Sequence, residues 1–317
     1  MIMAQSLFMT LRARQPEVQI DVLAPAWSAG ILGRMPQVRR ALPSPFAHGQ
    51  FDLAGRRRLA RALRAEDYAQ AIVLPNSWKS ALVPWLARIP LRTGYVGEFR
   101  YGLLNDARTL DQTALPLLAD RYCALASPPH SPRKAGHPRL RIDPQAQQAA
   151  LARQGLNTDR PILALCPGAE FGPAKRWPEA HYAAVARAKL AQGWQVWLFG
   201  SAKDRPVTDA IAALLPAPVA NLAGLTSLEE VVDLLALARA VVSNDSGLMH
   251  LAAAVDAPLA AIYGSSDPGY TPPLSPRARV LRLGLECSPC FQRECPLGHL
   301  DCLHKLTPEQ VLEALPQ

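Results

Sequence analysis

The stretch Ala240-Val-Val-Ser-Asn-Asp-Ser-Gly-Leu-Met-His-Leu-Ala-Ala-Ala-Val255, followed by Pro258-Leu-Ala-Ala-Ile-Tyr263, decides the fold of this chain. An apolar run ends at Ser243, a polar turn follows, a helical pattern begins near Gly247, and a second apolar run closes the unit. Short apolar runs bounded by turn residues are typical of buried strands. The order strand, helix, strand predicts a parallel βαβ unit.

The same alternation continues toward the amino terminus of this half. We expect strands over 161–165 and 194–199 and helices over 178–192, 204–215 and 227–237. The last helix opens with Ser227-Leu-Glu-Glu, in the manner of a capping box. Pro178 stands at a helix start, where its missing N–H costs least. This half therefore reads as α/β, a parallel sheet covered by helices.

The amino-terminal half repeats the theme less cleanly. Expected elements there are helices over 4–14, 55–65 and 78–87 and strands over 18–23 and 69–74. The Pro-rich, basic segment 127–138 lacks periodicity and is interpreted as a surface connection. With 317 residues, about two domains' worth, we predict domains over 1–140 and 141–317. Two such domains place a ligand cleft between the carboxyl ends of their sheets.

Composition bounds the class of protein. The chain is 49% hydrophobic and 19% charged, which allows a sizeable core. Six cysteines in this length exclude a small disulfide scaffold. No apolar run reaches the ~20 residues of a membrane-spanning helix, and no signal peptide is evident. We therefore expect a soluble cytoplasmic protein with reduced thiols.

The charge is unevenly divided. Residues 1–158 hold 21 Lys and Arg against 10 Asp and Glu, whereas residues 159–317 hold 13 against 16. A basic first half favours an anionic partner, such as nucleic acid, acidic lipid head groups or a phosphorylated glycan. An Arg-rich surface without a specific partner is the alternative.

The turn between Ser243 and His250 predicts a diphosphate site. Backbone N–H groups and the positive dipole end of the helix attract phosphate. Ser246 adds a hydroxyl donor, and Gly247 permits close approach. Asp245 suits sugar hydroxyls, or else caps the helix. His250 lies one turn inside, beside the ligand or simply in the core.

A second candidate is the loop after the first strand of this half, Pro167-Gly-Ala-Glu-Phe-Gly-Pro-Ala-Lys-Arg-Trp-Pro178. Lys175 there can neutralise a leaving diphosphate, although a solvated surface lysine is the alternative. The dinucleotide, P-loop and nucleophile-elbow motifs are absent from the sequence. Their absence weakens oxidoreductase, ATPase and α/β-hydrolase interpretations.

Two further clusters carry chemistry. Cys287, Cys290, Cys295 and Cys302 begin with zinc-like Cys-x-x-Cys spacing, but the later gaps are irregular. Buried thiols or a redox-sensitive loop are the alternatives to a metal. The stretch Gly55-Arg-Arg-Arg-Leu-Ala-Arg-Ala-Leu-Arg64 predicts an amphipathic helix. Its arginines either bind phosphates at a membrane surface or only form a face that is exposed to solvent.

Taken together, these residues resemble the ADP-heptose:lipopolysaccharide heptosyltransferases of glycosyltransferase family 9, and most closely those that add the second heptose. The resemblance extends over nearly the whole chain. It is carried by the segments 243–254, 166–170, 175–178, 263–273 and 287–299.

The resemblance implies a GT-B fold, α/β with two Rossmann-like domains of mostly parallel sheets facing a cleft. It implies an inverting, metal-independent transfer of L-glycero-D-manno-heptose from ADP-heptose, without a cofactor. The acceptor would be the first heptose of heptosyl-Kdo2-lipid A, a phosphorylated glycolipid at the inner face of the inner membrane. Residues 1–140 would bind this acceptor, and residues 141–317 would bind the nucleotide sugar.

The resemblance also assigns roles to individual residues. Lys175 would meet the donor phosphates and Asp245 the heptose hydroxyls, and both are predicted to be catalytic. The other residues predicted to bind the donor are Glu170, Asp204 at the ribose, Ser246, Gly247 and His250. Those predicted to bind the acceptor are Arg56, Arg57 and Arg61. No metal and no nucleic acid are expected.

One departure from the family concerns the start of the chain. In relatives, a strand and a Gly-Asp pair precede the Met-Ala-Gln-Ser that stands here at Met3–Ser6, and that Asp is the proposed general base. We therefore expect a truncated start, a first sheet short of a central strand, and impaired transfer. The alternatives are a non-catalytic binder of ADP-sugar or glycolipid, and an epimerase or hydrolase on the same fold.

Overall fold

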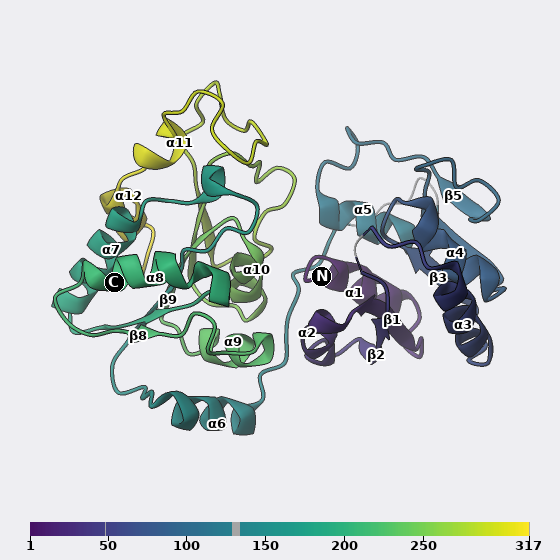
Figure 1. Ribbon diagram of the computed structural model, residues 1–317, viewed down its shortest axis with the longest axis horizontal. Helices are drawn as coiled ribbons and strands as arrows, with labels where there is room; N and C mark the ends of the chain where they lie inside the picture. Colours follow the sequence, from purple (N-terminus) through teal and green to yellow (C-terminus); the bar gives the residue numbers. More distant parts are fainter. Residues whose placement is uncertain (48, 129–133, 317) are drawn as a thin grey trace. The chain divides into compact units, whose positions relative to one another are not determined.

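The computed structural model describes residues 1–47, 49–128 and 134–316 (Figure 1). The chain forms two compact units, each described here by itself. Unit 1 comprises Met1, Met3–Gly33 and Gln37–Gly136, and unit 2 comprises Ile2, Arg34–Pro36 and His137–Gln317. Residues 129–133 of the predicted connection lie outside the described part of the chain.

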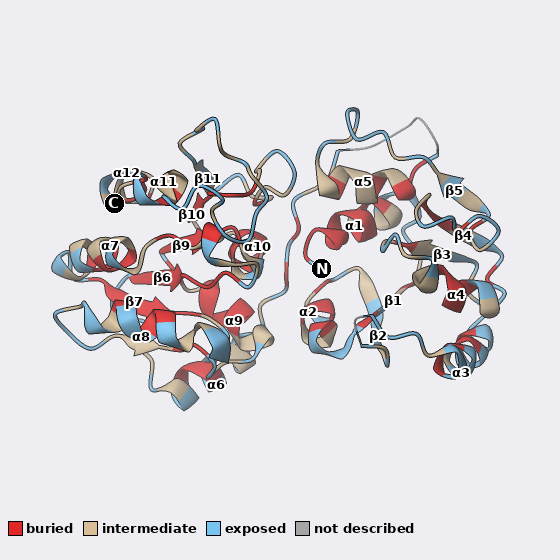
Figure 2. Ribbon diagram, turned by 45° about the horizontal axis from the view of Figure 1, so that its top comes forward, coloured by how far each residue is buried: buried red, intermediate tan, exposed pale blue. Residues whose placement is uncertain are grey.

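Unit 2 is built on one parallel sheet of six strands. The strands are β6 (Ile162–Cys166), β7 (Gln195–Leu198), β8 (Ala220–Asn221), β9 (Ala240–Asn244), β10 (Leu259–Ile262) and β11 (Ala278–Leu281). Their spatial order is β11-β10-β9-β6-β7-β8, and every pairing is parallel. The four central strands are buried along their whole length (Figure 2). Continuous apolar runs are what such doubly covered strands require.

Helices cover this sheet in two groups. The helices are α6 (Pro144–Gln154), α7 (Glu179–Ala191), α8 (Arg205–Ala213), α9 (Leu228–Leu235), α10 (Gly247–Ala254), α11 (Asp301–His304) and α12 (Pro308–Glu313). Helix α7 packs with α8 and α12, and α9 packs with α6 and α10. The predicted capping box at Ser227 is present and opens α9. The α/β prediction is confirmed for this half.

The strand order contains a reversal that positions a ligand site. From β6 the chain moves outward through β7 to β8, then returns to β9 on the other side of β6 and continues to β10 and β11. The loops after β6 and β9 therefore leave the sheet in opposite directions. In open α/β sheets, ligands bind at the carboxyl ends of the strands at such a switch point.

Unit 1 contains two short parallel sheets among the described residues. Strands β1 (Ile20–Pro25) and β2 (Val38–Ser44) form one sheet, and β3 (Gln70–Val73), β4 (Leu91–Tyr95) and β5 (Asp106–Arg108) form the other. The helices are α1 (Ala4–Arg14), α2 (Ala29–Gly33), α3 (Leu53–Arg64), α4 (Trp78–Leu86) and α5 (Leu118–Leu125). No helix in the described part of the chain is long and apolar enough to span a membrane.

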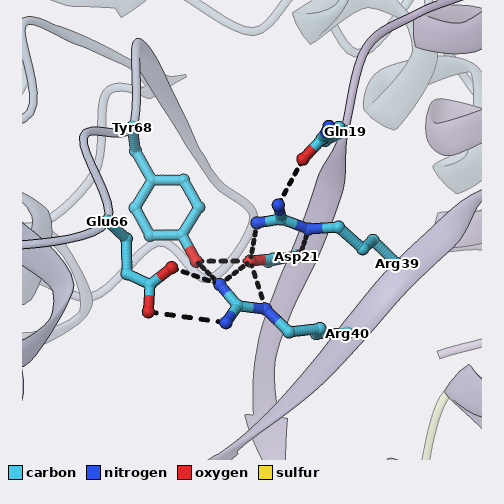
Figure 3. A network of polar contacts seen from close by, with 6 residues as sticks. All are labelled: Gln19, Asp21, Arg39, Arg40, Glu66 and Tyr68. Atoms are coloured by element: carbon cyan, nitrogen blue, oxygen red, sulfur yellow. Dashed lines mark hydrogen bonds and ion pairs between the residues drawn. The ribbon is translucent and has the colours of Figure 1, made fainter.

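A polar network joins the strands of unit 1 (Figure 3). The Asp21 carboxylate on β1 accepts hydrogen bonds from Arg39 and Arg40 of β2 and from the Tyr68 hydroxyl, which precedes β3. Arg40 also pairs with Glu66 at 2.5 Å. Burial raises the pKa of Asp21, but these hydrogen bonds outweigh it and hold the pKa well below its usual value. The network ties the β1–β2 sheet to the segment that leads into β3.

Candidate functional site

The two loops singled out in the sequence meet at the switch point of unit 2. Cys166, the last residue of β6, pairs with Ser243 of β9. The loop after β6 contains a 3-10 turn, η2 (Pro173–Lys175), and the loop after β9 leads directly into α10. Lys175 Nζ and Asp245 Oδ2 lie 2.5 Å apart, although 70 residues separate them in sequence. Their side chains are 18% and 5% exposed, respectively.

This ion pair places a cation at the carboxyl edge of the sheet. Lys175 Nζ also lies 5.0 Å from the centre of the Phe171 ring. The ammonium keeps some exposure, whereas the carboxylate behind it is nearly buried. The pair can therefore present positive charge to a ligand, with Asp245 orienting the lysine and offering a second acceptor oxygen.

The amino terminus of α10 lies beside this pair. Ser246 occupies the N-cap position in extended conformation, and its side chain forms no capping hydrogen bond. Gly247 has no atom within 4 Å of the position where a Cβ would stand, so the first helical turn is open at this point. An uncapped first turn of a helix attracts an anion. Asp245 is paired with Lys175, and the N-cap position belongs to Ser246.

Asn244 joins the two loops, a role that the sequence analysis missed. Its side-chain Oδ1 accepts hydrogen bonds from the backbone N–H of Trp177 at 3.1 Å and the Tyr182 hydroxyl at 3.0 Å. Its Nδ2 donates to the carbonyl of Pro167 at 2.7 Å. The residue is fully buried. Asn244 therefore holds the end of β9 against the loop after β6 and the start of α7.

His250 is partly buried on α10. Desolvation, with a smaller contribution from Lys175, lowers the pKa of His250 to about 4, although the Asp245 carboxylate opposes the shift. The imidazole is therefore neutral near pH 7. It can exchange hydrogen bonds with a ligand but adds no positive charge beside a phosphate.

Glu170 and Asp204 lie in loops next to this site, with other partners. Glu170 is exposed and pairs with the equally exposed Lys203 at 2.8 Å. The Asp204 carboxylate accepts hydrogen bonds from the backbone N–H and the hydroxyl of Ser201, which forms a capping box. It also lies against Gly168, where a Cβ would be 2.6 Å away. The structure thus assigns Asp204 a capping contact and Glu170 a surface ion pair.

Two buried hydroxyls were not predicted. Ser265 and Ser266 follow β10, and neither hydroxyl has a hydrogen-bond partner within the described ranges. The backbone N–H of Ser265 donates to the carbonyl of Ala174 in η2, so this loop lies against the one that carries Lys175. A buried polar group without a partner calls for a ligand or solvent partner. The signal in the sequence was the polar run immediately after a buried strand.

The cysteine segment supports the η2 loop. The backbone N–H of Ala174 donates to the carbonyl of Arg293 at 3.0 Å. A Cβ on Gly172 would lie 2.5 Å from that same carbonyl oxygen, so the close approach requires glycine. The contact therefore holds the η2 loop in addition to the hydrogen bonds of Asn244.

The four cysteines of this segment, Cys287, Cys290, Cys295 and Cys302, line one small cavity as free thiols. Backbone N–H groups, that of Leu300 foremost, lower the pKa of Cys295. In the described residues, no group of three or more His, Cys, Asp or Glu side chains is arranged to hold a metal ion.

The predicted acceptor residues lie on α3 in unit 1. Arg57 and Arg61 are exposed, but Arg56 is buried. The Arg56 guanidinium donates to the Lys79 carbonyl at 3.0 Å and lies 4.3 Å from the Phe46 ring centre. The expectation that Arg56 faces an acceptor is therefore corrected, because the side chain is buried and its Nη1 and Nη2 donate to backbone carbonyls within the unit.

Comparisons with known proteins identify a family that the chain matches. The model of glycosyltransferase family 9 (heptosyltransferase) matches residues 56–301. The chain is 48% identical to lipopolysaccharide heptosyltransferase 2 of Salmonella typhimurium over 99% of this chain and 94% of that protein. It is 47% identical to the Escherichia coli K12 protein of the same name, with the same coverage.

A solved structure agrees in fold. The structure of E. coli ADP-heptose LPS heptosyltransferase II superimposes with a TM-score of 0.88 at 46% identity, covering 99% of this chain and 93% of that one. The predicted α/β fold of GT-B type is thereby confirmed. Because the family model spans most of the chain and these relatives span nearly all of it, the chain belongs to glycosyltransferase family 9, the heptosyltransferases.

Proposed function

We propose that this heptosyltransferase moves L-glycero-D-manno-heptose from ADP-heptose to the first heptose of heptosyl-Kdo2-lipid A, in lipopolysaccharide inner-core synthesis. The observation that carries the proposal is the Lys175–Asp245 pair beside the open first turn of α10. The names of the similar proteins supply the sugar, the nucleotide and the acceptor class.

In this proposal the donor diphosphate lies against the amino terminus of α10. The N–H groups of its first turn and the hydroxyl of Ser246 donate to phosphate oxygens, and Gly247 leaves room for them. Lys175 approaches from the opposite loop. Asp245 accepts hydrogen bonds from the heptose while it holds the ammonium in place.

The chemistry follows from where charge develops. An acceptor hydroxyl attacks the anomeric carbon from the face opposite the diphosphate, and the bond between that carbon and the phosphate oxygen breaks. ADP leaves with the bonding electrons, and the acceptor proton passes to a general base, the role that the family resemblance gives to an aspartate that precedes the segment Met3–Ser6 in relatives. Lys175 and the α10 dipole stabilise the charge that grows on the leaving oxygen. Removing one such preorganised donor costs about 10²–10³ in rate.

The remaining predicted residues have supporting roles in this proposal. His250 is neutral near pH 7 and would lie near the donor sugar. Asp204 and Glu170 lie on the loops after β7 and β6, the side on which the adenosine would lie. The exposed Arg57 and Arg61 would meet acceptor phosphates. Residues 1–140 would serve the acceptor at the inner membrane face, and 141–317 the donor.

The test is ADP release from ADP-heptose, measured with and without heptosyl-Kdo2-lipid A. Transfer predicts release that depends on the acceptor and falls at least about hundredfold in Lys175→Ala and Asp245→Ala. If each variant stays within about threefold of the parent, the site assignment is wrong. Release without acceptor would indicate an epimerase or hydrolase. ADP binding with no turnover after acceptor is added would indicate a binder.

A further inference from the structure

The segment after β11 lies against the η2 loop and fixes the backbone of one arginine there. The carbonyl of Arg293 accepts the N–H of Ala174 at 3.0 Å, and a Cβ on Gly172 would lie 2.5 Å from the same oxygen. Two residues earlier, the N–H of Phe291 donates to the carbonyl of Ser265 at 2.7 Å. The backbone around Arg293 is therefore joined to the loops that follow β6 and β10, at the carboxyl edge of the sheet of unit 2.

The side chain of Arg293 lies by the same aromatic ring as Lys175. The guanidinium carbon of Arg293 is 5.5 Å from the centre of the Phe171 ring, and Lys175 Nζ is 5.0 Å from the same centre. A cation within about 6 Å of a ring centre is attracted by the π electrons of the ring. One half-buried phenylalanine therefore contacts both cations.

Arg293 differs from Lys175 because it has no charged partner. Among the described residues, no carboxylate lies within ion-pair distance of the Arg293 guanidinium, and the guanidinium donates no hydrogen bond. Lys203 foremost, and to a smaller extent Arg293, lowers the pKa of Glu170, but the partner of Glu170 at 2.8 Å is Lys203. The Arg293 side chain is exposed, so its five N–H donors are accessible to a ligand.

The charges that are paired at this edge of the sheet cancel one another. Asp245 neutralises Lys175, and Glu170 neutralises Lys203. His250 is neutral near pH 7, because burial lowers its pKa to about 4. The positive end of α10 amounts to roughly half an elementary charge. A nucleoside diphosphate carries more than one negative charge, so these groups alone do not compensate it.

The chemistry of arginine suits the missing charge. A planar guanidinium presents parallel N–H donors that match two oxygens of one phosphate group, whereas an ammonium acts as a point charge. A guanidinium also stays protonated at any working pH. Arg293 thus combines a fixed backbone, an aromatic contact shared with Lys175 and an unpaired charge.

We propose that Arg293 binds the diphosphate of the nucleotide-sugar donor, as a second cation beside Lys175. The inference deepens the proposed function and rests on it, because it takes the diphosphate to lie at the amino terminus of α10. Arg293 supplies the positive charge that no carboxylate cancels, whereas Lys175 is oriented by Asp245. The segment that carries the cysteines thereby acquires a role in donor binding, because its backbone contacts hold the arginine at the site.

The experiment is ADP binding, measured by calorimetry in the parent and in Arg293→Met. Methionine keeps an unbranched apolar side chain, and the hydrogen bond to Ala174 survives because it uses the main-chain carbonyl of residue 293. We expect the affinity for ADP to fall about tenfold, the order of one charge-assisted hydrogen bond at an exposed site. Arg293→Lys keeps the charge but loses the paired donors, so its affinity should fall only about threefold.

Two controls separate phosphate binding from other effects. Arg239→Met removes an exposed arginine directly before β9, at the opposite edge of the same sheet, and should leave the affinity for ADP unchanged. Binding of adenosine, followed by NMR titration, should be equal in the parent and in Arg293→Met, because adenosine has no phosphate. Circular dichroism establishes that the variants fold.

Three outcomes overturn the inference: an ADP affinity within about twofold of the parent in Arg293→Met, equal weakening in Arg239→Met, or equal weakening of adenosine and ADP. If Lys175→Met weakens ADP binding and Arg293→Met does not, the proposed diphosphate site stands and the inference fails. If Arg293→Met weakens ADP binding as expected but the parent transfers no heptose, the proposed transfer fails and the role of Arg293 in binding stands.

Discussion

Replacing Lys175 by methionine tests the site most directly, because methionine keeps an apolar stem and removes only the charge. Two effects are expected. Asp245, whose side chain is 5% exposed, loses its cation. Breaking a fully buried pair costs about 3–5 kcal/mol. Because Lys175 is 18% exposed and water reaches it, we expect about 1–3 kcal/mol, a fall of several degrees in the melting temperature.

The second effect is on the reaction. Loss of a preorganised cation at the leaving diphosphate predicts a fall of about 10²–10³ in kcat, or about 3–4 kcal/mol of transition-state stabilisation. The two effects separate in the double variant Lys175→Met with Asp245→Asn. The neutral amide needs no cation, so stability should return toward that of the parent, whereas activity should stay low.

The assay pairs thermal unfolding with steady-state ADP release. Arg205→Met is the matched control, because Arg205 belongs to an exposed pair with Asp209 on α8 and should change neither measurement. Activity of Lys175→Met within about threefold of the parent would refute the catalytic reasoning. Unchanged melting in Lys175→Met, or a lowered melting temperature that the double variant does not recover, would refute the reasoning about burial.

Three further predictions follow from the same site. Asn244→Ala removes three hydrogen bonds between β9, the loop after β6 and α7, and should lower the free energy of unfolding by about 2–4 kcal/mol in urea titrations; a loss below about 0.5 kcal/mol would contradict the role of Asn244. Gly247→Val should leave the melting temperature nearly unchanged, since open space surrounds the position. It should weaken ADP binding at least about tenfold, as measured by calorimetry. Unchanged affinity for ADP would mean that the diphosphate binds elsewhere. The pKa of His250 is about 4 in the folded chain and about 6.5 in the unfolded chain, so the unfolded state binds more protons between these pH values. The free energy of unfolding should therefore fall as the pH decreases from about 6.5 to 4. His250→Gln should flatten that part of the profile of melting temperature against pH.

Much of the fold could be predicted because its signals are local. Every helix and strand expected from periodicity and caps is present, with boundaries that differ by at most two residues. The elements that were missed include the edge strands β2, β8 and β11, whose half-exposed residues weaken the apolar pattern. They also include the central strand β4 and the helices α5 and α6, of which α6 buries only Ala150 and Leu151. Periodicity reports burial, so strands that are little buried leave little trace.

The limits of local reading appear most clearly in unit 1. The arginine run 56–58 looks uniform in sequence, yet Arg56 is buried over Phe46 while Arg57 and Arg58 are exposed. Arg100 likewise carries no local sign that it is buried and donates to two backbone carbonyls. Which arginine is buried depends on backbone carbonyl groups of segments that are distant in the sequence. A short stretch of sequence around the arginine therefore cannot predict its burial.

The sequence by itself determined the family, the alternating elements of unit 2 and the two loops that carry Lys175 and Asp245. Only the tertiary structure decided that their charged atoms lie 2.5 Å apart, that Asn244 fixes the loops and that the hydroxyls of Ser265 and Ser266 lack partners among the described residues. The reason is physical. Helix and strand signals depend on neighbours a few residues away, whereas a site at a switch point is assembled by strand order, which brings together residues far apart in the chain.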